Sequence, residues 1–263
     1  MEPLYVIKIG GNILDATEPL QAFLKSFASV PGKKILIHGG GKIATRIGDQ
    51  LGIESKYVDG RRITDAATID LVTMVYGGLV NKQVVAQLQA LGTNAIGITG
   101  ADANLIPAKK RPVKEIDYGF VGDVKSAAIP PASWQVLINN GWVPVVAPLT
   151  HDQEGHILNT NADTMAQEIA KALAPYYKVQ LIYSFEKAGV LLDANDDSTV
   201  IPEIKPDHYE TLKASGKIFA GMIPKLDNAF AAVRDGVNKV IIGNAAQLEL
   251  LIAGKTGTSI VHE

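Results

Sequence analysis

The chain has 263 residues, a formal net charge of −2, 47% hydrophobic residues and no cysteine. This length suffices for one large α/β domain or two lobes around a sizeable core. The lack of cysteine excludes disulfides and thiolate metal sites, and the charge gives no basic surplus that would indicate nucleic-acid binding. No apolar run approaches the ~20 residues of a membrane span, and no signal peptide fits before Lys8. We therefore expect a cytoplasmic protein with no membrane partner.

Apolar runs of strand character alternate with helical patterns along the chain, which predicts a mostly parallel sheet covered on both faces. A hairpin is expected over residues 56–64, around Asp59-Gly60, and a small antiparallel excursion over 101–128. A seam at 174–175 divides the chain into a predicted N-terminal lobe, residues 1–175, and a C-terminal lobe, residues 176–263. The predicted strands cover residues 4–9, 33–38, 94–99, 142–147, 179–184, 240–242 and 258–261, and the predicted helices cover 18–29, 42–51, 66–91, 130–140, 163–174, 207–214, 222–235 and 246–253.

Glycine turns follow the first two predicted strands. Residues 5–9 lead into Gly10-Gly11-Asn12, and residues 35–37 lead into His38-Gly39-Gly40-Gly41-Lys42. Glycine leaves main-chain N–H groups uncovered by a Cβ, and a helix N-terminus adds partial positive charge. Two such turns at neighbouring strand ends predict a phosphate held from two sides.

Two familiar nucleotide motifs fit poorly. Residues 39–44 formally match the dinucleotide fingerprint G-x-G-x-x-A, but the acidic residue expected ~20 positions later, Asp59, falls in a hairpin turn. A P-loop is absent, because Glu249 occupies the glycine position required before Gly254-Lys255-Thr256. A nicotinamide-binding oxidoreductase therefore stays as a weaker alternative.

Basic residues near the glycines are the first candidates for chemistry. Lys8 lies inside an apolar strand, where its charge is costly unless it has a partner. Lys225 opens a helix after residues 221–224, and a solvated lysine is the simpler interpretation there. Arg61 and Arg62 alternate along the hairpin, so only one of them is expected to face the site.

The segment 159–163 combines two asparagines and an aspartate where a helix begins. Asn161 is interpreted first as the helix N-cap. Asn159 lies outside the helix and is free to donate to a ligand carboxylate, while Asp163 is placed to orient two lysines. The five histidines show no metal-ligand spacing, so no metal site is predicted in the chain.

The motifs together resemble the amino acid kinase family over the full length of the chain. The combination of GRRIT with NxNAD resembles those members that act on an N-acylated glutamate. This resemblance implies a three-layer αβα sandwich with an open, mainly parallel central sheet. The N-terminal lobe would bind acyl-glutamate and dimerise, and the C-terminal lobe would bind ATP with Mg²⁺. The motifs are KIGGN (8–12), HGGGK (38–42), DGRRIT (59–64), YGG (76–78) with NK (81–82), VGDV (121–124), NTNAD (159–163) and GMIPK (221–225).

By this resemblance, the γ-phosphoryl group moves in line to the substrate's side-chain carboxylate, as a step of arginine biosynthesis. That carboxylate is already ionised at neutral pH, so no general base is required. The planar fork of Arg62 suits a clamp on the α-carboxylate. The implied residues are catalytic Lys8, Lys225 and Asp163, substrate-binding Gly40, Gly41, Arg62 and Asn159, and nucleotide- or phosphate-binding Gly10, Gly11, Glu186, Gly189 and Lys217.

Several questions stay open at the level of sequence. Glu186 and Lys187 replace the common Asp-Val of the family's nucleotide-side turn. The acyl group is not fixed, with acetyl as the family default and succinyl as an alternative. Family members inhibited by arginine carry an extra N-terminal helix that joins dimers into hexamers, so a dimer without arginine inhibition is expected. A regulatory ligand-binding module that has lost turnover is a further alternative.

Overall fold

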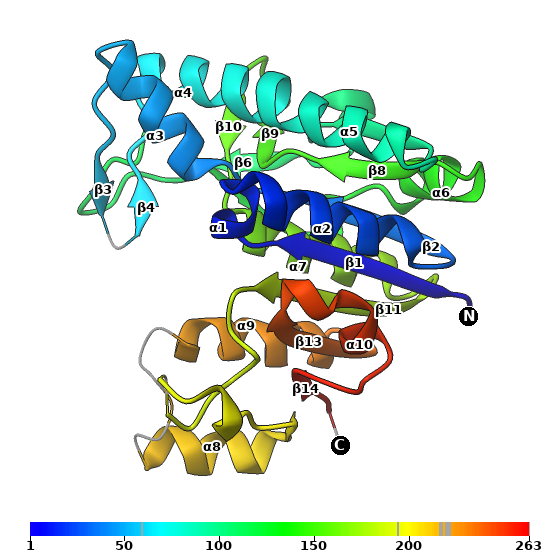
Figure 1. The fold of residues 1–263 in the computed structure, drawn as a ribbon. Helices are drawn as coiled ribbons and strands as arrows, with labels where there is room; N and C mark the ends of the chain where they lie inside the picture. Colours follow the sequence, from blue (N-terminus) through cyan, green and yellow to red (C-terminus); the bar gives the residue numbers. More distant parts are fainter. Residues whose placement is uncertain (59, 194, 216–217, 219–221, 263) are drawn as a thin grey trace.

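An eight-stranded sheet forms the centre of the molecule, between two layers of helices (Figure 1). The computed structural model describes residues 1–58, 60–193, 195–215, 218 and 222–262. Neighbouring strands of this sheet run parallel except at the β13–β14 pair, so the predicted mainly parallel αβα fold is confirmed. In spatial order the strands are β12 (Glu203–Ile204), β14 (Thr258–Ile260), β13 (Lys239–Asn244), β11 (Lys178–Phe185), β1 (Pro3–Ile9), β2 (Lys33–Ile37), β8 (Val143–Val146) and β5 (Ala95–Ile98).

The two faces of the sheet bury separate apolar cores. Along β1, Leu4 and Val6 pack into one core, and Ile7 and Ile9 pack into the other, as the two-residue period of a strand requires. Apart from the segment 66–91, every predicted helix and main-sheet strand lies within two residues of its observed bounds. One core is covered by α6 (Pro131–Asn139), α7 (Ala162–Leu173), α8 (Pro206–Ala214) and α9 (Ile223–Arg234), and the other by α1 (Gly11–Leu14), α2 (Thr17–Ser29), α3 (Gly41–Gln50), α4 (Ala66–Val72), α5 (Asn81–Ala90) and α10 (Leu248–Ile252).

The segment predicted as one helix over 66–91 contains a π-helical stretch. Helix α4 passes into η1 (Thr73–Val80), which continues directly into α5. Tyr76 lies in this π-helical stretch, and a Cβ on Gly40 of the second glycine turn would lie 2.9 Å from its ring. Short π segments often mark functional sites, because they shift side chains out of the regular helical register.

Three small antiparallel sheets stand beside the main sheet. The first two are the predicted hairpin and excursion, although Asp59 of the hairpin turn lies outside the described residues. The pair β9–β10 was not predicted, because three-residue strands carry almost no periodic signal. Their strands are β3 (Tyr57–Val58) with β4 (Arg61–Arg62), β6 (Ala108–Lys110) with β7 (Gly122–Val124), and β9 (Leu149–His151) with β10 (Ile157–Asn159).

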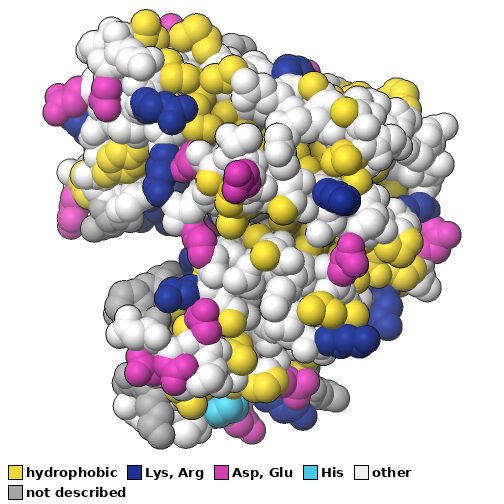
Figure 2. Space-filling model, viewed as in Figure 1, with side chains coloured by type: hydrophobic (Ala, Val, Ile, Leu, Met, Phe, Trp, Pro, Cys, Tyr) yellow, Lys and Arg dark blue, Asp and Glu magenta, His cyan; other side chains and the backbone are white. Residues whose placement is uncertain are grey.

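The main sheet continues across the predicted boundary between the two lobes. Strands β1 and β11 pair over seven positions, from Pro3 opposite Lys178 to Ile9 opposite Ser184. The division into two lobes between residues 175 and 176 stays a prediction, because strands from both predicted lobes pair within one continuous sheet. The surface is hollowed between the β3–β4 hairpin and the part built from α8 and α9, beside the carboxyl ends of β1 and β11 (Figures 1 and 2). None of the helices in the described ranges has both the length and the apolar character needed to cross a bilayer.

Candidate active site

An ion pair lies where β1 reaches its carboxyl end. The Nζ atom of Lys8 is 2.7 Å from Oδ1 of Asp163, and the two side chains are 17% and 30% exposed. Asp163 is the second residue of α7, after the N-cap Asn161, whose side chain accepts a hydrogen bond from the Thr164 N–H at 3.0 Å. The partner that the buried charge of Lys8 required is thus supplied by the first turn of a helix more than 150 positions later in the chain.

Two residues of the neighbouring strand β11 hold this ion pair in position. Tyr183 stands opposite Lys8, and its hydroxyl donates to the carbonyl oxygen of Asp163 at 3.1 Å. Burial, followed by the charges of Asp163 and Glu168, raises the pKa of Tyr183 well above its ordinary value, so the phenol remains a donor. The Ser184 hydroxyl donates to the Lys8 carbonyl at 2.9 Å.

Lys225 lies in the first turn of α9, with its Nζ atom 5.2 Å from the centre of the Phe185 ring. A cation at this end of a helix faces the positive pole of the helix dipole, which is unfavourable unless an anion binds nearby. Phe185 ends β11, and a Cβ on Gly10 would lie 3.2 Å from its Cα. Lys8 and Lys225 therefore both stand at the carboxyl edge of β1 and β11, while their joint action on a phosphoryl group stays a prediction.

In the first glycine turn, one of the two main-chain N–H groups expected to face a phosphate is already hydrogen-bonded. The Gly10 N–H donates to the carbonyl of Ser184 at 2.7 Å, so it is not available to a phosphate as predicted. Gly10 is instead required for close packing, because a Cβ there would lie 3.0 Å from the same carbonyl oxygen. Gly11 is the first residue of α1, and an N–H in a first turn has no carbonyl of its own helix to donate to.

The second glycine turn leads into α3. Gly40 has φ of +146°, a conformation that side chains rarely adopt. Gly41 opens the helix, and its carbonyl accepts from Arg62 Nη2 at 2.8 Å and from Thr45 Oγ1 at 3.0 Å. Lys42 donates to the side-chain oxygen of Asn12, which links the two glycine turns.

A cavity of about 230 Å³ opens beside the second glycine turn. It is bordered by that turn, the β3–β4 hairpin, the end of β10 and the start of α7. All four predicted substrate-binding residues line it, namely Gly40, Gly41, Arg62 and Asn159. Arg61 lines it as well, so the expectation that only one of the two arginines faces the site is wrong.

Arg62 is 6% exposed and held in one orientation. Its guanidinium donates to the Gly41 carbonyl, to Thr45 Oγ1 at 2.9 Å and to Ser55 Oγ, and it lies 4.8 Å from the centre of the Tyr57 ring. These bonds use three of the five N–H donors of an arginine and leave two for a ligand. Arg62 is therefore pre-organised within the cavity wall.

His38 supports the second glycine turn from the protein interior, a role that the sequence analysis did not predict. It is fully buried, with Nδ1 2.7 Å from the Gly39 carbonyl and Nε2 3.1 Å from Nδ2 of Asn81, which also donates to the Val145 carbonyl. The Asn81 amide donates to Nε2, so the proton of the neutral ring sits on Nδ1. Burial lowers the pKa of His38 to about 4, although the bond to Gly39 opposes this shift. A histidine directly before three glycines at a strand end was the available signal.

The residues predicted on the nucleotide side are only partly described. Glu186 is exposed, and its carbonyl accepts from Nδ2 of Asn244 at 2.9 Å. Gly189 is buried, and a Cβ there would lie 2.6 Å from Val200 Cγ2 and 2.7 Å from Thr258 Oγ1, so packing alone requires glycine. Lys217 lies outside the described residues, and the nucleotide-binding roles remain predictions.

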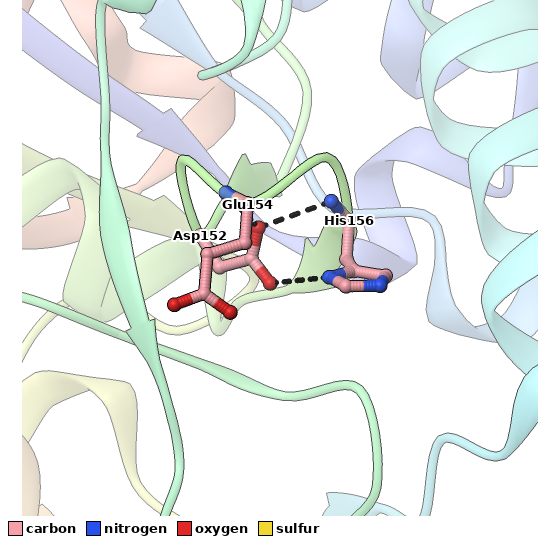
Figure 3. A group of neighbouring side chains, drawn as sticks. All are labelled: Asp152, Glu154 and His156. Atoms are coloured by element: carbon pink, nitrogen blue, oxygen red, sulfur yellow. Dashed lines mark hydrogen bonds and ion pairs between the residues drawn. The ribbon is translucent and has the colours of Figure 1, made fainter.

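Within the described part of the chain, one group of three side chains has the spacing of metal ligands, namely Asp152, Glu154 and His156 (Figure 3). The Asp152 carboxylate accepts from the Glu154 and His156 N–H groups at 2.8 and 3.0 Å and contacts His156 Nδ1 at 2.7 Å. Burial acts to raise the pKa of Asp152, but these bonds hold it at about 2. The bonds close the turn between β9 and β10, and none of the three residues lines the cavity.

Comparisons with known proteins agree over nearly the whole chain. Residues 3–244 match the amino acid kinase family. An acetylglutamate kinase from Cytophaga hutchinsonii is 57% identical and aligned over 99% of both chains, and one from Parabacteroides distasonis is 57% identical over 94% of this chain and 96% of its own. The solved structure of smu.665 from Streptococcus mutans UA159 is 28% identical, with a TM-score of 0.77 and 99% of each chain covered. Sequence and fold therefore agree that the chain belongs to the amino acid kinase family.

Proposed function

We propose that the protein transfers the γ-phosphoryl group of ATP to the side-chain carboxylate of N-acetyl-L-glutamate or a related N-acyl-glutamate. The products are ADP and an acyl phosphate, and the reaction is a step in arginine biosynthesis. Two relatives at 57% identity are acetylglutamate kinases, which supports the reaction and the substrate class. The observation that carries the proposal is the Lys8–Asp163 pair, because the start of α7 that holds it also lines the cavity.

The cavity suits a substrate with two carboxylates. Arg62 can offer the α-carboxylate its positive charge and one of its remaining N–H donors, and Asn159 lines the same cavity. Helices α3 and α7 both begin at the cavity, and their positive ends favour the reacting carboxylate and the phosphate that joins it. The reacting carboxylate is ionised at neutral pH, so the site requires no general base.

Phosphoryl transfer depends chiefly on positioning and charge neutralisation. Lys8 and Lys225 would neutralise the moving group from two sides, and Asp163 would orient Lys8. Mg²⁺ binds through substrate phosphates, water and one or two carboxylates, so it is expected to arrive as part of MgATP. Gly11, Glu186, Gly189 and Lys217 are assigned to the nucleotide side as part of the same proposal.

The acyl phosphate can be trapped with hydroxylamine after incubation with N-acetylglutamate and MgATP. Replacing Lys8 or Lys225 by alanine should lower kcat by ~10²–10³ while the KM values change little. A matched control is Lys178→Ala, since this exposed lysine begins β11 at the opposite edge of the sheet. Absence of hydroxamate from the unaltered protein would refute the proposed reaction.

A cytoplasmic location and a homodimer belong to the same proposal. Sedimentation of the purified protein at micromolar concentration would test the dimer. A single species with the mass of one 28.0 kDa chain would contradict it.

A further inference from the structure

A second cavity, of about 550 Å³, adjoins the proposed substrate cavity. The two cavities share Arg61, Arg111 and Asp123 among their lining residues, so they are direct neighbours. Lys114 and Glu115 line the second cavity but not the first. Neither the phosphoryl group nor the α-carboxylate of the proposed substrate accounts for this space.

The charges in the two cavities exceed what an N-acetyl substrate requires. Arg62 already serves the α-carboxylate, and the side-chain carboxylate faces the glycine turns and Lys8. Two further guanidinium groups remain, those of Arg61 and Arg111. An acetyl group carries no charge that either arginine could bind.

The two remaining arginines differ in how they are held. Arg111 is fixed by Asp123, with its Nε atom at 3.0 Å and its Nη2 atom at 2.5 Å from Oδ1, and it lies 5.3 Å from the centre of the Tyr118 ring. Its Nη1 group remains for a ligand. Arg61 is exposed and has no ion pair within the described ranges, so its charge is available to an anion in either cavity.

We propose that the acyl group of the substrate extends from the first cavity into the second and ends in a carboxylate that Arg61 and Arg111 bind. The preferred substrate would then be a glutamate acylated by a dicarboxylic acid, for which N-succinyl-L-glutamate serves as the test compound. This inference rests on the proposed kinase reaction and specifies its acyl group. Asp123 acts by positioning Arg111, and the opposite charges of Lys114 and Glu115 in the second cavity offset each other.

The test compares N-succinyl-, N-butyryl- and N-acetyl-L-glutamate as substrates. The butyryl group has the same chain length as succinyl but no charge, so it separates charge from size. We expect kcat/KM for the succinyl compound to exceed that for the butyryl compound about tenfold or more. In Arg61→Gln this ratio should fall toward one, whereas Lys109→Gln, an exposed β6 residue that lines neither cavity, should keep it.

The outcomes separate this inference from the kinase proposal. Turnover of all three compounds without a succinyl preference would overturn the inference and leave the proposed reaction intact. The inference would also be overturned if Arg61→Gln left the ratio of kcat/KM between the succinyl and butyryl compounds unchanged. If none of the three is phosphorylated, the kinase proposal fails, and calorimetry without ATP still decides the acyl group. Binding of the succinyl compound no tighter than the butyryl compound would then refute the inference.

Discussion

The neutral state of His38 predicts how the stability of the protein depends on pH. Its buried ring donates from Nδ1 to the Gly39 carbonyl and accepts at Nε2 from Asn81. Protonation would place a second N–H on Nε2, facing the Asn81 amide hydrogens. The pKa of His38 is about 4 in the folded protein, against about 6.5 in an unfolded chain.

The sign and size of the effect follow from proton linkage. Because the unfolded chain binds the proton more readily, the free energy of unfolding rises with pH between the two pKa values. The contribution is fully present above pH 6.5 and is lost as the pH falls toward 4. A shift of this size corresponds to about 3 kcal/mol in total and to about 2 kcal/mol between pH 7 and pH 5.

The assay is urea unfolding at pH 7, 6 and 5 for the unaltered protein and for His38→Gln. Glutamine can donate to Gly39 and accept from Asn81, but it does not titrate. Other groups contribute equally to both proteins, so the difference between the two pH profiles isolates His38. Profiles that stay parallel from pH 7 to pH 5 would refute the reasoning, as would an NMR titration of the His38 ring near pH 6.5.

Three further predictions concern the cavity and the ion pair. Gly40→Ala should cost about 1–3 kcal/mol in the free energy of unfolding and also lower activity, because its φ of +146° is strained for alanine and the new Cβ would meet Tyr76, whereas Gly39→Ala, with no atom within 4 Å of its Cβ, should cost less. Arg62→Lys should raise the KM for the acyl-glutamate about 10- to 100-fold and leave the KM for ATP unchanged, because an ammonium cannot keep the bonds to Gly41, Thr45 and Ser55 and still reach the ligand. Asp163→Asn should lower kcat about tenfold or more, since Lys8 loses the charge that orients it, and unchanged single-turnover rates would contradict this role.

The main elements were predictable because their signals are local. A helix longer than eight residues or a buried strand shows its period within its own sequence. The π segment over residues 73–80 is different, because its sequence pattern continues the helical pattern on either side and does not distinguish a π turn from an α turn. The four-residue helix α1 and the three-residue strands β9 and β10 are too short to show a period, and their contacts within the fold define them.

Parts of the candidate site were predictable because burying an unpaired charge costs free energy. A lysine in an apolar strand needs a counter-charge, and Lys8 has one in Asp163. The N–H group of Gly10 is already used by the Ser184 carbonyl of a neighbouring strand, and the sequence does not reveal this. Alternation placed Arg61 and Arg62 on opposite sides of a hairpin, but in a two-residue strand at a cavity mouth both sides reach the same space.

Strand order explains why residues so distant in sequence meet at one edge. Strand β1 lies between β2 and β11, so Lys8, the second glycine turn and Phe185 end side by side. In a parallel sheet, a helix that follows a strand starts where that strand ends, so α3 presents its positive end at this same edge. Asp163 reaches the edge because α7 also starts there. The edge at which we propose that the phosphoryl group binds is therefore a consequence of sheet topology, and Lys8 and Arg62 add charges to it.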